Sequence, residues 1–230
     1  MTDIDGRLAE IPSPPPRLRL VGDDALLMTR KALAIVGTRD PDQAEALLAY
    51  QLGAAAAARG FLVVSGLALG IDGAAHRGAL SAGQTVAFLG CGLANISPRS
   101  HRGLAGEILK ADGFLASEVT DDAVTRPQYL IARNRLVSGL SDATVVIASG
   151  LDGGTMHTVR FAVQQRQKVF CPAISGIGGD GVKALLQVPG SELSGTSKAF
   201  RRVKMEASDP IGIPFSDIDE LLDDIDQKNT

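Results

Sequence analysis

The chain has 230 residues, of which 45% are hydrophobic and 21% charged, and a formal net charge of −3 at pH 7, as in a soluble globular protein with a full core. No apolar run reaches the roughly 20 residues that cross a bilayer, and the proline-rich start does not resemble a secretory signal, so the sequence predicts a cytoplasmic protein with no membrane partner. Two cysteines, Cys91 and Cys171, exclude a disulfide framework and offer no metal-ligand spacing, and we expect both to be buried.

The charges are unevenly distributed along the chain. Residues 206–230 hold eight acids and one base, which leaves 18 acids and 22 bases in residues 1–205, a net charge of +4. A mildly basic body is compatible with a polyanionic ligand, although a solvated surface is the commoner source of such numbers.

The first 30 residues contain a proline cluster and little periodicity, which predicts an N-terminal arm or short cap. Residues 31–190 alternate between short apolar runs and stretches of helical length, and the nearly continuous apolar character of the runs is typical of strands covered on both faces. The predicted strands are Leu33–Val36, Leu62–Val64, Thr85–Leu89, Phe114–Ala116, Thr144–Ala148 and Lys168–Cys171.

The stretches between these strands predict helices. They are Pro41–Arg59, Ile71–Ala82, His101–Ala111, Pro127–Gly139 and Thr155–Gln165. The alternation predicts an α/β fold: a Rossmann-like, doubly wound and mainly parallel sheet with helices on both faces. Residues 191–230 predict a C-terminal extension, in which Ser216 could cap an acidic amphipathic helix, Asp217–Asp226, that docks on the body or on a partner.

Small and polar residues follow the predicted strands at the edge where ligands of open parallel sheets bind. They are Gly37, Thr38 and Arg39 after the first strand, Ser65 and Gly66 after the second, and Gly153, Gly154 and Thr155 after the fifth. Glycine amides and helix N-termini attract anions, and hydroxyl groups can donate to phosphate oxygens. One such loop also suits an ordinary turn, but three at corresponding strand ends predict a phosphate-binding edge.

Two arginines on the helix that precedes the fifth strand are further candidates. Arg133 and Arg135 are two positions apart, so their side chains point in different directions. One could contact phosphates while the other pairs with an acid such as Glu118 or Asp142, and a structural ion pair is an equal alternative for each.

Several kinds of site are disfavoured. The glycine loops match neither the phosphate loop of nucleotide hydrolases nor the dinucleotide fingerprint. No nucleophile and histidine occur at a catalytic spacing, and Asp72 and His76, four residues apart, favour a structural hydrogen-bonded pair over an acid–base pair. Aromatic residues make up only 4% of the chain and tryptophan is absent, which counts against an extended base-stacking platform.

Four ordered blocks resemble the DNA-processing protein A (DprA/Smf) family: Ala34–Arg39, Val64–Leu80, Phe88–Leu93 and Ala132–Leu140. The resemblance runs from about residue 31 to about residue 186. It implies a Rossmann-like core that binds single-stranded DNA in transformation and recombination, with no catalytic activity or cofactor, and with RecA and a second copy of the chain as further partners. Carried over by position, the anion-binding set is Gly37, Thr38, Arg39, Ser65, Gly66, Arg133, Asn134 and Arg135, with Asn134 as a structural residue between the arginines.

The resemblance also extends to a wider superfamily, which includes the LOG-type nucleoside-monophosphate phosphoribohydrolases and nucleotide-sensing modules. The hydrolases have a Gly-Gly-x-Gly-Thr-x-x-Glu loop. Here Gly153, Gly154 and Thr155 are followed by Thr158 at the position of the catalytic glutamate. This difference argues against the hydrolase and leaves a nucleotide-binding sensor as the alternative.

Overall fold

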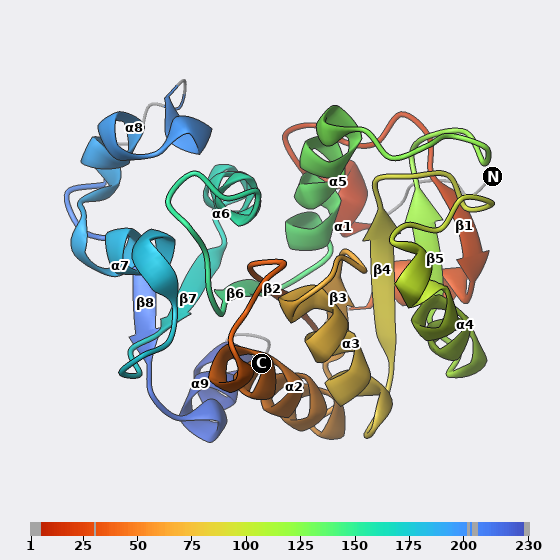
Figure 1. Ribbon diagram of the computed structural model, residues 1–230, viewed down its shortest axis with the longest axis horizontal. Coiled ribbons are helices and arrows are strands. Elements are labelled where there is room, and N and C mark those ends of the chain that lie inside the picture. The colour runs from red at the N-terminus through yellow and green to blue at the C-terminus, as the bar shows by residue number, and fades with distance from the viewer. Residues whose placement is uncertain (1–5, 30, 202, 204–206, 228–230) are drawn as a thin grey trace.

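The computed structural model describes residues 6–29, 31–201, 203 and 207–227. Its strands are β1 (Arg19–Gly22), β2 (Ala32–Val36), β3 (Leu62–Ser65), β4 (Thr85–Leu89), β5 (Phe114–Ser117), β6 (Ala143–Val146), β7 (Lys168–Pro172) and β8 (Gly212–Phe215). They form one sheet in the order β1-β5-β4-β3-β2-β6-β7-β8 (Figure 1). Strand β1 is antiparallel to β5, and all the other neighbours are parallel, which confirms the predicted doubly wound, mainly parallel sheet.

Helices cover both faces of this sheet. They are α1 (Arg7–Glu10), α2 (Gln43–Ala58), α3 (Ile71–Leu80), α4 (Arg102–Lys110), α5 (Pro127–Gly139), α6 (Thr155–Gln164), α7 (Gly179–Gln187), α8 (Leu193–Thr196) and α9 (Ile218–Asp226). The core clusters place α1, α5, α6 and α7 on one face and α2, α3, α4 and α9 on the other. Strand β2 shows why the runs are continuously apolar: Ala34 and Val36 enter one core, and Leu33 and Ile35 the other.

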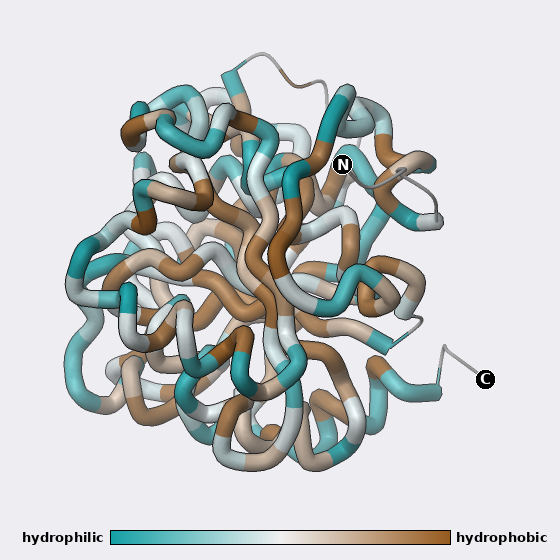
Figure 2. Tube along the Cα trace, turned by 90° about the vertical axis from the view of Figure 1, so that its right-hand side faces the viewer, coloured by the Kyte–Doolittle hydropathy of each residue, from teal (hydrophilic) through white to brown (hydrophobic). Residues whose placement is uncertain are grey.

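The hydrophobic segments gather in the interior of the molecule, and hydrophilic segments dominate its periphery (Figure 2). Within the described part of the chain, no helix is both long enough and apolar enough to cross a membrane.

The two outermost strands, β1 and β8, were not predicted. Both are four residues long and lie at the edges of the sheet, so neither has the continuous apolar run of a central strand. The residues of β1 are half-buried or exposed, and β8 contains Pro214, which suits an edge because proline has no N–H for a neighbouring strand. The N-terminal arm and the C-terminal extension therefore each add a strand to the sheet, while the domain boundaries at residues 30 and 190 stay predictions.

Helices α2 and α3 approach each other so closely that glycine is required where they meet. A Cβ atom at Gly78 would overlap the backbone carbonyl of Tyr50, and one at Gly53 would overlap the carbonyl of Ala75. This contact fixes the position of α3 against α2, and α3 begins directly after the loop that follows β3.

Helix α9 docks on the body of the same chain. Its apolar residues Leu221, Leu222 and Ile225 are buried in the core beneath α2. Its acids form ion pairs with body cations: Arg59 with Asp219 (2.7 Å) and Asp223 (2.5 Å), Lys168 with Asp224 (2.8 Å), and Lys31 with Asp226 (2.8 Å). The predicted cap, Ser216, is wrong by one residue, because the carboxylate of Asp217 accepts the N–H groups of Asp219 and Glu220.

Candidate functional site

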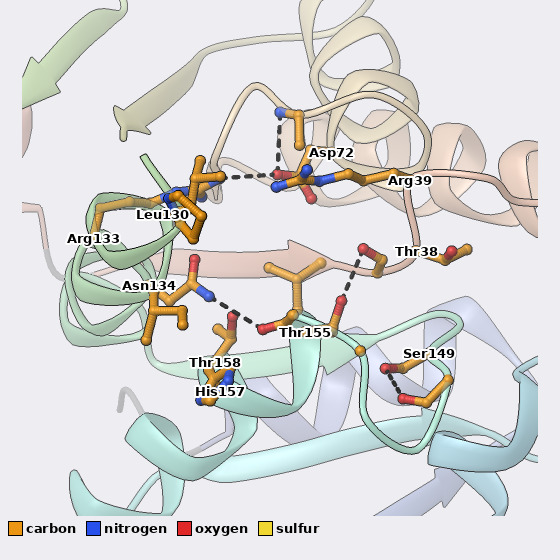
Figure 3. Close-up of a pocket in the computed structure, with 18 residues that line it drawn as sticks. Thr38, Arg39, Asp72, Leu130, Arg133, Asn134, Ser149, Thr155, His157 and Thr158 are labelled. Atoms are coloured by element: carbon orange, nitrogen blue, oxygen red, sulfur yellow. Dashed lines mark hydrogen bonds and ion pairs between the residues drawn. The ribbon is translucent and has the colours of Figure 1, made fainter. Parts of the chain in front are cut away.

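A pocket of about 490 Å³ opens beyond the carboxyl ends of β2 and β6 (Figure 3). Strand order reverses between these two strands, since β3, β4 and β5 lie on one side of β2, whereas β6, β7 and β8 lie on the other. At such a switch point the adjacent loops diverge and leave a crevice, which is the usual ligand site of open α/β sheets. The volume is within the range of small-molecule and nucleotide sites.

Most of the predicted site residues line this pocket. They come from three segments, namely the loop after β2, the middle of α5, and the loop that leads into α6. The residues brought together are Gly37, Thr38, Arg39, Arg133, Asn134, Gly153, Gly154 and Thr155. The pocket therefore has the predicted composition, and anion binding by these residues stays a prediction.

Two other predicted residues are structural and do not face the pocket. Ser65 is fully buried, and its hydroxyl donates to the carbonyl of Ile35 (2.7 Å), so the prediction that it donates to a phosphate is wrong. Arg135 binds both carboxylate oxygens of Glu118 at 2.5 Å and donates through Nε to the carbonyl of Ser13 (2.7 Å). Arg135 is therefore the arginine that pairs with Glu118, and contact of Arg133 with phosphates stays a prediction.

Gly66 also lies outside the pocket wall and acts through Arg133. Its N–H donates to Asp72 (3.1 Å), and its carbonyl accepts from Nη2 of Arg133 (3.1 Å), so its amide is not free for an anion. A Cβ atom at this position would overlap the guanidinium of Arg133. Glycine is required here because the arginine passes directly over the backbone.

Arg133 forms the floor of the pocket beside a single carboxylate. It is 6% exposed, Asp72 is 5% exposed, and Nη2 lies 3.7 Å from Oδ2 of Asp72. Burial lowers the pKa of the Arg133 guanidinium, and the negative charge of Asp72 opposes this shift. Nε of Arg133 is buried without a hydrogen-bond partner, so this cation is only partly satisfied by the protein.

Arg39 is the second cation of the pocket, and it differs from Arg133 in being exposed. Its guanidinium reaches from the loop after β2 toward Asp72 (Figure 3). Among the residues that the structure describes, none forms a hydrogen bond or ion pair with the Arg39 side chain. It is therefore free to bind a ligand.

The opposite wall is the start of α6. This helix has no side-chain cap, so its first N–H groups carry the positive end of the helix dipole without a side-chain acceptor. The hydroxyl of Thr155 donates to the carbonyl of Gly37 (2.9 Å), which joins the two loops and leaves that hydroxyl proton unavailable to a phosphate. Asn134 also holds this wall, because its Nδ2 donates to the carbonyl of Gly154 (3.4 Å).

Sequence reasoning missed several residues of the wall. Pro127, Leu130 and Ile131 share one face of α5 with Asn134, a spacing of three and four residues that could have revealed them. His157 also lines the pocket, and its Nδ1 is buried without a partner. Burial, and then the nearby charge of Arg160, lower the pKa of His157, so it is neutral at pH 7.

Comparison with known proteins decides the family. The family model of DNA recombination-mediator protein A matches residues 2–208. The chain belongs to this family. The resemblance to the DprA/Smf family is thereby confirmed.

Individual members of the family give the same result. Protein Smf from Escherichia coli (strain K12) is 43% identical over 115 residues, which are 50% of this chain and 31% of the relative. DNA processing protein DprA from Bacillus subtilis (strain 168) is 33% identical over 166 residues, 71% of this chain and 55% of the relative. The chain thus spans only a third to about half of the length of these curated relatives.

Solved structures extend the likeness to nearly the whole chain. The structure of DNA processing protein A from Helicobacter pylori, described for its single-stranded DNA binding mode, has a TM-score of 0.81 and 26% identity, and covers 99% of this chain and 95% of that one. The molybdenum cofactor binding protein from Rippkaea orientalis has a TM-score of 0.57 and 19% identity over 88% of this chain and 99% of its own. The second comparison shows likeness of fold alone.

In this DNA recombination-mediator protein A family member, Asp72 and His76 do not form the predicted pair. Asp72 accepts the N–H groups of Gly66 (3.1 Å) and Ala68 (3.3 Å). Nε2 of His76 accepts the N–H of Leu67 (3.3 Å), so Nδ1 carries the proton and donates to the hydroxyl of Thr85 (2.7 Å). The two side chains separately brace the loop after β3, which is a structural role.

The neutral state of His76 predicts a pH-dependent stability. Burial, and then the charge of Arg133, lower its pKa to about 3, so the folded protein excludes a proton that the unfolded chain binds below its ordinary pKa of 6.5. Stability from His76 is therefore complete above pH 6.5 and is lost as the pH falls from 6.5 toward 3. Between pH 7 and pH 5 the loss from this residue is about 2 kcal/mol.

Urea unfolding of the wild type and of His76→Gln at both pH values measures this loss. The wild type should lose about 2 kcal/mol more than the variant between pH 7 and pH 5. Equal losses in the two proteins would show that other groups, such as His157, dominate the pH dependence.

Proposed function

We propose that the protein binds single-stranded DNA and that the pocket at the ends of β2 and β6 seats its phosphates. The observation that carries the proposal is the pairing of Arg39, which is free, with the partly satisfied Arg133 across from the uncapped start of α6. Guanidinium groups and helix N-termini are the donors that phosphates prefer. Membership of the family, and the likeness to the H. pylori protein described for single-stranded DNA binding, support the choice of ligand.

The local charge favours an anion. Asp72 is the one carboxylate among the residues that line the described pocket, and it already accepts two backbone N–H groups besides its contact with Arg133. Two guanidinium groups and a helix dipole therefore face one carboxylate, which leaves the pocket positive.

The residues that stand at the catalytic positions of the LOG-type hydrolases fit binding rather than catalysis. Thr158 stands in the place of the catalytic glutamate and is 2% exposed. His157 is neutral and Asp72 is held by backbone amides. The chain is thus proposed to act in recombination by holding the strand, and its contacts with RecA and with a second copy stay predictions from the family.

The salt dependence of binding tests this proposal. If Arg39 and Arg133 each neutralise one phosphate, the logarithm of the affinity for oligo-dT should fall against the logarithm of salt concentration with a slope of about −1.4. Arg39→Ala should flatten this slope to about −0.7 and weaken binding to all sequences alike. Fluorescence anisotropy of a labelled oligonucleotide at several salt concentrations measures both.

Arg166→Ala is the matched control, because Arg166 is also exposed but follows α6 at the opposite end of the sheet. An Arg39→Ala protein with the slope and affinity of the control would exclude Arg39 from the site. A parallel titration with nucleoside monophosphates distinguishes single-strand binding from the alternative, a nucleotide sensor. Tight binding of mononucleotides without any binding of oligonucleotides would indicate the sensor.

A further inference from the structure

A second cavity, of about 460 Å³, lies on another face of α5 from the phosphate pocket. The residues that enclose it come from the N-terminal arm, the ends of β4 and β5, α5 and α6. Arg133 lines both cavities, so this side chain forms a common wall between them. Any strand that places a phosphate beside Arg133 therefore also passes close to the second cavity.

Aromatic rings are concentrated in this cavity to a degree that the composition does not predict. The chain has nine phenylalanine and tyrosine residues. Six of them are buried in the core: Phe61, Phe88, Phe114, Phe170, Phe200 and Phe215. Of the three that remain accessible, Tyr129 and Phe161 line this one cavity, and Tyr50 lies on the outside of α2.

Each of the two rings is accompanied by an arginine. The guanidinium carbon of Arg126 lies 5.8 Å from the centroid of the Tyr129 ring, and that of Arg160 lies 4.4 Å from the centroid of the Phe161 ring. Nε of Arg160 is buried without a hydrogen-bond partner. Aromatic faces next to guanidinium groups are the usual surroundings of a stacked base in single-strand binding proteins.

The remaining polar groups of the cavity do not repel nucleic acid. Its carboxylate, Glu118, is neutralised by Arg135 through two hydrogen bonds of 2.5 Å. The other contributions include Leu89, Val119 and Ala132, which suit the flat apolar surface of a base.

We infer that this cavity is a base-binding subsite, in which an unstacked nucleobase of single-stranded DNA contacts Tyr129 and Phe161 while the adjoining phosphate lies beside Arg133. The inference rests on the proposed function and extends it from the backbone to the bases. It also explains how a chain with few aromatic residues can use stacking: two rings in one cavity serve a single base, and no extended platform is required.

Intrinsic fluorescence tests the contact directly. The chain has no tryptophan and two tyrosines, so in Tyr50→Phe all tyrosine emission comes from Tyr129. Oligo-dT should quench this emission, whereas an oligonucleotide of equal length with abasic sugars should bind more weakly and leave the emission unchanged. Binding of oligo-dT without any change in Tyr129 emission would overturn the inference and leave the proposed function intact.

A substitution separates the base from the phosphate. Phe161→Leu keeps an apolar side chain and removes the ring, so affinity for oligo-dT should fall roughly 10-fold while the salt slope and the affinity for the abasic oligonucleotide stay unchanged. Tyr50→Leu, at an exposed tyrosine outside the cavity, should have no effect. Equal weakening of both oligonucleotides by Phe161→Leu would overturn the subsite, and failure of the wild type to bind any oligonucleotide would overturn the proposed function as well.

Discussion

Replacing Arg133 with methionine is expected to lower the free energy of unfolding by about 3 kcal/mol, because the substitution leaves the buried carboxylate of Asp72 without its counter-charge. The contact between Arg133 and the carbonyl of Gly66 is lost as well. Urea unfolding at pH 7 measures the change. Binding of oligo-dT should also be lost, since the arginine forms the wall shared by both cavities.

Arg39→Met is the matched control for this prediction. It removes the same charge from the same pocket, but its side chain is exposed, so the free energy of unfolding should change by less than about 0.5 kcal/mol. The double variant Arg133→Met with Asp72→Asn should recover part of the loss, because the unpaired charge is then absent. If Arg133→Met is no less stable than Arg39→Met, the buried pair contributes nothing and the arginine serves the ligand alone.

Gly78→Ala is expected to destabilise the protein by about 2–3 kcal/mol, although alanine is the better helix former. The added methyl group would overlap the carbonyl of Tyr50, and backbone cannot move aside as a flexible side chain can. Helices α2 and α3 must then separate, which disturbs the first turn of α3, where Asp72 lies. Thermal and urea unfolding measure the effect.

Gly106→Ala provides the comparison. Gly106 lies in α4, and apart from its chain neighbours and the backbone of its own helix, no described atom lies within 4 Å of the position that a Cβ would take. Alanine should therefore stabilise the protein at this site by about 0.5–1 kcal/mol. A similar gain at Gly78 would contradict the close packing of α2 against α3.

The central strands could be predicted because each has buried side chains on both faces of the sheet, which makes its sequence a continuous apolar run. Strand β2 illustrates this, since its five residues are all buried and its apolar run is unbroken. The edge strands β1 and β8 face solvent or loops on one side, so their sequences carry no comparable signal and their pairing depends on tertiary contacts.

The candidate site was predicted in outline because the carboxyl ends of parallel strands meet at one edge of the sheet. Position along a strand does not reveal whether a hydroxyl faces the ligand or the interior, and Ser65 and Thr155 both donate to backbone carbonyls. The role of Gly66 was missed for a similar reason: its partner, Arg133, is 67 residues away in the sequence. The second cavity could not be predicted, since Tyr129 and Phe161 come together only when α5 packs on α6.

The docking of α9 decides where the acids of the C-terminal segment lie relative to the pocket. The helix packs beside Lys31 and Lys168, which stand at the amino ends of β2 and β7, and so its carboxylates lie at the edge of the sheet opposite to the pocket at the carboxyl ends of β2 and β6. Four of its acids pair there with Arg59, Lys168 and Lys31, so the acidic helix is held at the amino ends of the strands. Under the proposed function, we expect a single strand to be attracted to the edge that carries Arg39 and Arg133, because the acids of α9 are kept at the opposite edge.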